Sequence, residues 1–317
     1  MPAEMSPGLQ ASLNVLIPGY QKLAQIGVGA RSTIYKVVEE STGKIFALKH
    51  VVRQDDEDER FLRQAELGYE ISSKVDHQHL RASYAIRRVR KWTKLREVYV
   101  VMEYVEGMTL EQARPNRLDW FLAIMRKVAA GLDALHEAGY VHADIKPNNI
   151  LLGRDGLVKI IDFGQSCPVG HRKERIQGTP DYIAPEQIRR MPLAPTTDVF
   201  NLGATMYWVL ADRPFPTEFQ QPFGEGGIEV VRPKEALTPK EINAKVPMVL
   251  SQLVMDCCRD NPAQRPADMK QLAARLAVVQ RMWRKQTQAV KAKLRAGKEV
   301  KGATMHDRRT GTRPGHE

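Results

Sequence analysis

Cysteine is scarce in this 317-residue chain, and long apolar runs are missing from it. The three cysteines, Cys167, Cys257 and Cys258, are an odd number without the spacing of a metal site, and the histidines are scattered. No run approaches the eighteen or so apolar residues of a membrane-spanning helix, so no membrane span is expected. The first residues lack the basic start and apolar core of a signal peptide, which makes a cytoplasmic location the default expectation.

Positive charge is concentrated at the C-terminal end. The formal net charge is +11, and residues 281–317 supply +8 of it, with eleven Lys and Arg against three Asp and Glu. That segment has one aromatic residue, Trp283, so stacking on nucleic-acid bases is poorly supported. We predict a leader over residues 1–19, a globular unit over 20–280, and a basic, disordered tail over 281–317 that could bind nucleic acid or another acidic surface.

The polar segment over residues 142–149 carries the strongest chemical signal, because it lies between two apolar stretches and is therefore expected to face a cleft. Asp144 can orient a hydroxyl group and take its proton, and Lys146 can neutralise charge on a phosphate. Asn149, and Asp162 thirteen residues later, offer the hard oxygen ligands that Mg²⁺ prefers. Together these side chains predict phosphoryl chemistry at a metal-dependent site.

The segment resembles the catalytic loop of the eukaryotic-like serine/threonine protein kinase family, and Asp162-Phe163-Gly164 resembles the metal-binding motif of that family. The resemblance covers about residues 20–280. It implies an α+β, bilobal protein kinase-like fold with a small β-rich N-lobe over about residues 20–104. The larger, helical C-lobe is then expected over about residues 105–280.

The resemblance also implies an activity: a serine/threonine protein kinase, which transfers the γ-phosphoryl group of ATP to a hydroxyl group of a protein substrate. Asp144, Lys146 and Asn149 would be its catalytic residues, and Asn149 with Asp162 would hold Mg²⁺. ATP and Mg²⁺ are accordingly the expected cofactors. The segment from Gly178 to Glu186 resembles the protein-docking part of the activation segment, which makes a small-molecule substrate less favoured.

A glycine-rich turn and an apolar strand are expected to bind the nucleotide. Gly27-Val28-Gly29 resembles the kinase glycine-rich loop, with Ser32 in the place of a third glycine. Lys49 lies in an otherwise apolar strand and resembles the lysine that holds the α- and β-phosphates. The residues that the resemblance places around ATP are Ile26, Gly27, Val28, Gly29, Ser32, Ile34, Ala47, Lys49, Glu103 and Val105.

The expected glutamate partner of Lys49 is missing from its usual register. In kinases the helix after the lysine strand carries a Glu that pairs with that lysine, and the spacing here lands on Gly68. Glu66 and Glu70 each lie about 200° around a helix from position 68. Either could pair with Lys49 if the helix were shifted, or the ion pair could be absent.

Further residues match structural parts of the family. Asp198 is expected to accept backbone N–H bonds from the loop near His142, and Arg265 resembles the arginine that pairs with Glu186. Ala143 stands where many kinases have an arginine that receives an activation-loop phosphate. We therefore predict an activity that does not need activation-loop phosphorylation.

Two alternatives stay open at the level of sequence. An ATP-binding pseudokinase that acts as a scaffold is favoured by Gly68 and by the incomplete glycine motif. A module that binds nucleic acid or an acidic surface through the basic tail is favoured by the charge of residues 281–317.

Overall fold

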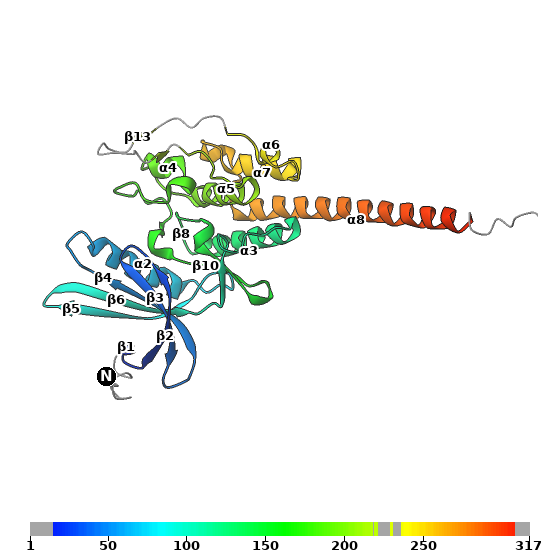
Figure 1. Ribbon diagram of the computed structural model, residues 1–317. Coiled ribbons are helices and arrows are strands. Elements are labelled where there is room, and N and C mark those ends of the chain that lie inside the picture. The colour runs from blue at the N-terminus through cyan, green and yellow to red at the C-terminus, as the bar shows by residue number, and fades with distance from the viewer. Residues whose placement is uncertain (1–14, 218, 221–228, 231–235, 308–317) are drawn as a thin grey trace, which may run out of the picture.

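The computed structural model describes residues 15–217, 219–220, 229–230 and 236–307; most of the expected leader and the last ten residues lie outside this part. The described chain folds into a smaller lobe built on a β-sheet and a larger lobe built on helices (Figure 1). The α+β, bilobal architecture predicted from the sequence is confirmed.

The N-lobe is organised by a six-stranded antiparallel sheet in the order β1-β2-β3-β4-β6-β5. Val37, Leu48 and Val101 are buried on one face of this sheet, where branched and aromatic side chains pack well. The prediction that residues 1–19 form a leader is corrected at its C-terminal end. The apolar strand over residues 15–17 pairs with β2 and belongs to the sheet. The strands are β1 Val15–Ile17, β2 Tyr20–Val28, β3 Ser32–Glu39, β4 Ile45–Val52, β5 Ser83–Lys91 and β6 Lys94–Glu103.

A helix, α2 (Glu59–Lys74), packs against the other face of the sheet. It buries Leu62 and Ala65 against the sheet, as an amphipathic surface helix does, while Ile71 lies on another side of the helix and packs with Leu80. Glu59 in its first turn and Lys74 in its last both interact favourably with the helix dipole. The middle of α2 also contacts the segment Phe163–Gln165, where Gln64 and Gly68 lie beside Gly164, so this helix connects the sheet to the site between the lobes.

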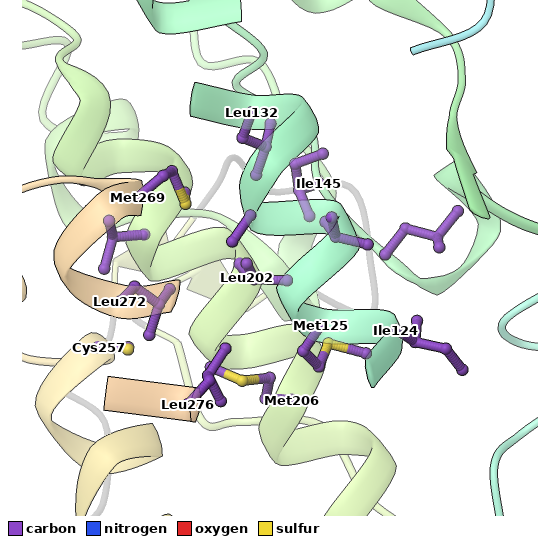
Figure 2. Packing of buried hydrophobic residues seen from close by; sticks show 14 of the residues in the cluster. Ile124, Met125, Leu132, Ile145, Leu202, Met206, Cys257, Met269, Leu272 and Leu276 are labelled. Carbon is purple, nitrogen blue, oxygen red and sulfur yellow. The ribbon is translucent and has the colours of Figure 1, made fainter. Parts of the chain in front are cut away.

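The C-lobe is built around α5 (Pro195–Ala211), whose residues 197–207 are all buried. Leu202 and Met206 of α5 pack with Ile124, Met125 and Leu132 of α3 in one large apolar cluster (Figure 2). The helices are α3 Leu118–Glu137, α4 Pro185–Ile188, α5, α6 Pro239–Ile242, α7 Met248–Cys257 and α8 Met269–Asp307. The strands are β7 Gly107–Thr109, β8 Tyr140–Val141, β9 Ile150–Gly153, β10 Val158–Ile160, β11 Cys167–Pro168, β12 Phe219–Gln220 and β13 Glu229–Val230.

Helix α8 contradicts the prediction of a disordered tail. The helix runs from Met269 to Asp307, so residues 281–307 are helical, and only 308–317 lie outside the description. Its first part is anchored by Met269, Leu272 and Leu276, which are buried against α3 and α5 (Figure 2). Beyond that anchor the chain is rich in Lys, Arg, Ala and Gln and has no proline before Pro314, a composition that favours helix continuation. In Figure 1 the helix extends well past the C-lobe.

Within the described ranges, every helix is too short or too polar to cross a bilayer. The basic α8 segment is exposed at Arg281, Arg284 and Lys285, beside the C-lobe. Binding of nucleic acid or an acidic surface through this segment stays a prediction, and so does the cytoplasmic location.

Candidate active site

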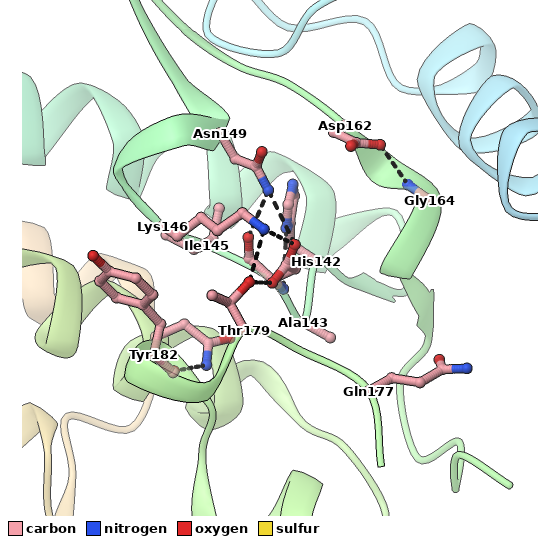
Figure 3. Close-up of polar contacts among 12 residues, drawn as sticks. His142, Ala143, Ile145, Lys146, Asn149, Asp162, Gly164, Gln177, Thr179 and Tyr182 are labelled. Atoms are coloured by element: carbon pink, nitrogen blue, oxygen red, sulfur yellow. Dashed lines mark hydrogen bonds and ion pairs between the residues drawn. The ribbon is translucent and has the colours of Figure 1, made fainter. Parts of the chain in front are cut away.

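The loop between β8 and β9 brings together the three predicted catalytic side chains, and Figure 3 labels Lys146 and Asn149 among them. The Asp144 carboxylate is nearly buried, and its Oδ2 lies 2.9 Å from the Lys146 Nζ. The Asn149 Nδ2 donates to the Asp144 carbonyl over 2.8 Å and to Oδ2 over 3.2 Å. The Thr179 hydroxyl donates to Asp144 Oδ1 over 2.8 Å and accepts from the Lys146 Nζ over 2.7 Å. A carboxylate that already accepts a hydroxyl beside an ammonium can orient a second hydroxyl group for transfer.

Asp198 on α5 anchors the backbone of this loop, and the prediction of its role is confirmed. Its carboxylate accepts the N–H groups of His142 and Ala143, each over 2.8 Å, and lies 2.7 Å from Nε2 of His136. Ala143 adopts a left-handed φ of 61°, which costs energy for a residue with a side chain and needs such support. The Gln187 amide donates to the Ala143 carbonyl over 2.8 Å, so this residue is held on both sides.

The residues predicted to hold Mg²⁺ fit that ion. Both hydrogen bonds from the Asn149 side chain to Asp144 are donated by its amide nitrogen. The amide oxygen, Oδ1, accepts no hydrogen bond from the residues that the structure describes. Asp162 lies in the left-handed region, with a φ of 64°, and its side chain is half exposed. Mg²⁺ is commonly bound by one or two protein oxygens, with phosphates and waters completing the octahedron. An amide oxygen and a carboxylate at this site match that requirement.

Lys49 on β4 reaches the same carboxylate from the N-lobe. Its Nζ lies 3.1 Å from Asp162 Oδ1, and the side chain is 19% exposed. The charge of Lys49 lowers the pKa of Asp162, and the nearby Arg81 and the Gly164 N–H act in the same direction. Asp162 is therefore anionic at neutral pH and available to a cation.

The helix glutamate is absent from this arrangement. The spacing from Lys49 predicts that position 68 takes the place of the usual glutamate. Gly68 does face the Asp162 segment, and a Cβ built on it would lie 3.3 Å from the Gly164 nitrogen. Glu66 forms an ion pair with Arg88 on β5 instead. Glu70 pairs with Lys74 over 2.7 Å on the outer face of α2. Neither glutamate pairs with Lys49.

The glycine-rich turn lies between β2 and β3. The Gly29 N–H donates to the Ser32 carbonyl over 2.7 Å, and Ile26 and Val28 expose their apolar side chains at the end of β2. Exposed apolar groups beside a glycine-rich turn suit a purine and its phosphates. The turn is tied to the entry of α2 by Arg31, whose Nε donates to the Asp58 carboxylate over 2.7 Å.

The remaining predicted nucleotide residues lie where the antiparallel strands β4 and β6 pair beside the connection to the second lobe. Ala47 is buried and pairs with Met102, while Ile34 on β3 pairs with Lys49. The Glu103 N–H donates to the Ala82 carbonyl over 2.9 Å, which fixes the backbone just before Val105. These predicted residues therefore surround one region of the N-lobe, next to Lys49.

Sequence reasoning missed three side chains near the site. Thr179 was expected on the docking surface, yet it touches both Asp144 and Lys146. The Gly-Thr-Pro triplet was the available signal for it. Arg31 and Arg81 had no local signal, because their partners lie on other elements and come close only after folding.

Comparison with known proteins shows which family this chain resembles in sequence. The family model of the protein kinase domain matches residues 20–276. The chain is 31% identical to the serine/threonine-protein kinase PknL of Mycobacterium tuberculosis over 271 residues, which are 82% of this chain and 65% of that protein. It is 28% identical to the serine/threonine-protein kinase drp72 of Corynebacterium efficiens over 274 residues, which are 83% of this chain and 51% of the relative.

A third relative, the serine/threonine-protein kinase PknA of Corynebacterium glutamicum, is 27% identical over 264 residues. That alignment covers 80% of this chain and 55% of the relative. The chain thus spans between about half and two thirds of the length of these curated relatives.

Proposed function

The chain belongs to the protein kinase family, and from this membership we propose that it transfers the γ-phosphoryl group of ATP to serine or threonine hydroxyls of proteins. The observation that carries the proposal is the position of the Asp144 carboxylate. It accepts a hydrogen bond from the Thr179 hydroxyl over 2.8 Å and lies 2.9 Å from the Lys146 ammonium. Both groups are held by a loop that α5 fixes through Asp198.

In the proposed reaction Asp144 orients the substrate hydroxyl and accepts its proton as the oxygen attacks phosphorus. Lys146 neutralises charge on the transferred phosphoryl group, and Lys49 holds the α- and β-phosphates. Both ammonium groups lie beside a site carboxylate, which keeps them near the position that the phosphates would take. Positioning and charge neutralisation carry most of the rate enhancement in this chemistry.

Asn149 and Asp162 are the residues that would hold Mg²⁺, through the free amide oxygen of one and the carboxylate of the other. When bound, the ion would neutralise charge on the β- and γ-phosphates. Asn149 has a second role that needs no metal, since its amide restrains the Asp144 carboxylate through two hydrogen bonds.

The direct test is transfer of label from γ-labelled ATP to the protein itself and to a generic basic protein substrate. We expect turnover within the range of about 1–100 s⁻¹ that is usual for kinases, with label on serine or threonine. Removal of Mg²⁺ by a chelator should abolish the transfer. Nucleotide binding without any transfer would instead support the scaffold alternative, which the missing glutamate at position 68 favours.

We also propose that this activity does not depend on phosphorylation of the activation segment. Ala143 packs with Val141, Cys167 and Leu193 in a small apolar cluster, a poor receptor for a phosphate. Backbone bonds already order the segment: β11 pairs with β8, and the Gly170 N–H donates to the Leu193 carbonyl over 2.8 Å.

The hydroxyl groups of the segment support the same proposal. Ser166 is fully buried, Tyr182 is 8% exposed, and the Thr179 hydroxyl is bonded to Asp144. None of them is presented to another kinase. In addition, the Lys173 Nζ donates to the Gln165 carbonyl over 2.6 Å, a restraint on the segment that needs no phosphate.

Phosphatase treatment is therefore expected to leave the transfer rate within about two-fold of the untreated rate. The reason is that the bonds that order the segment form between unmodified groups. Mass spectrometry before and after treatment would identify the phosphates removed, and a steady-state assay would give the rate. A phosphate on Ser166, Thr179 or Tyr182 that raises the rate many-fold would contradict the proposal.

A further inference from the structure

Arg81 is a buried cation whose guanidinium donates no hydrogen bond to any residue that the structure describes. The residue is only 8% exposed. Its backbone is fixed beside the metal-binding segment, because its N–H donates to the Ile160 carbonyl over 3.0 Å and Leu80 forms a β-bridge with Ile160. Arg81 thus lies across from Ile160, two positions before Asp162. Burial lowers the pKa of the Arg81 guanidinium.

The side chain of Arg81 faces a small cavity of about 20 Å³ between α2 and the Asp162 segment. The cavity is lined by Lys49, Gly68, Met102, Arg81 and Asp162, among others, and has room for about one water molecule. Because position 68 is a glycine, α2 brings no carboxylate to this space. The charged groups that line it are therefore two cations and one carboxylate.

Asp162 is the carboxylate best placed to compensate Arg81. The anions that act on the guanidinium are Asp162 and Glu103. The Glu103 carboxylate is already engaged, since its Oε2 lies 2.8 Å from the Lys159 Nζ and accepts the Ala82 N–H over 3.3 Å. A buried cation without a compensating anion is costly, so Arg81 depends on Asp162. The dependence is mutual, because Arg81 and Lys49 are the two side-chain cations that stabilise the anionic form of Asp162.

We infer that Arg81 is a positioning residue, which holds the Asp162 carboxylate from behind when Lys49 turns from it to the phosphates of ATP. The inference rests on the proposed function, in which Lys49 and Asp162 both act on the nucleotide. Lys49 has no glutamate to restrain it here, so we expect its Nζ, which lies 3.1 Å from Asp162, to move towards a phosphate when ATP binds. Arg81 then remains as the cation that fixes the orientation of Asp162.

The variants Arg81→Met and Arg81→Lys test this role. Mutation of a residue that supports a metal ligand commonly lowers metal affinity or activity by about 10–100-fold. Arg81→Met should therefore lower kcat by at least about 10-fold. The affinity for ATP without Mg²⁺ should stay within about two-fold. The melting temperature should stay the same or rise, because the substitution removes a buried cation and keeps an apolar chain of similar length beside Met102. Arg81→Lys, which keeps the charge, should recover part of the lost activity.

A second measurement does not require phosphoryl transfer. Mg²⁺ should tighten ADP binding to the wild-type chain, and Arg81→Met should reduce this effect. Loss of a nearby positive charge would by itself strengthen metal binding, so a weaker effect reports a misoriented Asp162. If the wild-type chain binds nucleotide without transferring phosphate, the proposed function fails, and this measurement still decides the role of Arg81.

Arg88→Met is the matched control, because Arg88 lies on the neighbouring strand β5 and pairs with Glu66 away from the cavity. It should leave kcat and the Mg²⁺ effect unchanged. The inference is overturned if Arg81→Met keeps kcat and the Mg²⁺ effect within two-fold of wild type. It is equally overturned if Arg81→Met and Arg81→Lys lose the same activity together with a lower melting temperature, which would indicate a packing role.

Discussion

Replacing Asp144 with asparagine is expected to lower kcat by about 10²–10⁴-fold, the range that a positioned general base contributes. Asparagine keeps the shape of the side chain and can still accept the Thr179 hydroxyl, but it cannot take a proton at neutral pH. It also removes the negative charge beside Lys146, whose ammonium lies 2.9 Å from the carboxylate. The substitution therefore affects both the base and the cation that faces the phosphate.

The fold and the nucleotide affinity should survive this substitution. The loop backbone is held by Asp198 and Gln187, and neither interaction involves the Asp144 side chain. Steady-state kinetics at saturating ATP would give kcat, and ATP binding with a melting curve would show that the variant is folded. Asp155→Asn is a suitable control, because Asp155 is exposed in the same lobe and its φ of 53° is one that asparagine tolerates. A variant of Asp144 with a rate within about three-fold of wild type would refute the assigned role.

The site could be predicted from sequence where each role depends on a residue type at a fixed spacing. Asp144 and Asn149 lie five residues apart on one restrained loop, so their contact follows from local geometry. The role of Asp198 was predicted from the resemblance of residues 198–203 to the start of a buried kinase helix, and its bonds to the loop backbone confirm it. Counting from Lys49 placed Gly68 at the position of the usual glutamate, and in the structure Gly68 and Lys49 line the same small cavity.

Other features depended on tertiary context that no local pattern records. Arg81 lies in an irregular segment, and its burial follows from the way that residues 79–81 pair with β10. The extended helix α8 was mistaken for disorder because its charge was weighed more heavily than its helix propensity and its buried start at Met269. The short strand β1 was missed since it has only three residues, of which Val15 and Ile17 have partners in β2.

The ion pair between Arg265 and Glu186 is expected to give the largest stability effect in the C-lobe. The pairing predicted from sequence is confirmed as a fork, with contacts of 2.7 and 2.9 Å between the two side chains. The remaining guanidinium N–H groups donate to the carbonyls of Arg259, Thr196 and Asp260. All five donors of the guanidinium are thus used, and its side chain has no exposed surface. The pair links the short helix α4, at the end of the docking segment, to the connection between α7 and α8.

Arg265→Met should reduce the free energy of unfolding by about 3–5 kcal/mol, because it leaves the Glu186 carboxylate buried without its cation. At roughly 2–4 °C per kcal/mol for a chain of this class, the melting temperature should fall by about 10 °C. Urea unfolding and a melting curve would measure both quantities. Lys270→Met provides the exposed control: the Lys270 Nζ lies 2.6 Å from the Glu137 carboxylate, but both side chains are mostly in water, so its loss should cost less than about 1 kcal/mol.

The double variant Glu186→Leu with Arg265→Met separates the two sources of the effect. If the loss arises from an uncompensated carboxylate, removing that carboxylate should restore much of the stability, since apolar groups of similar volume often replace buried ion pairs at little cost. The carbonyls of Arg259, Thr196 and Asp260 would still lack their donor, so recovery should be incomplete. A double variant as unstable as Arg265→Met alone would show that those carbonyl bonds, and not the ion pair, hold this corner of the C-lobe together.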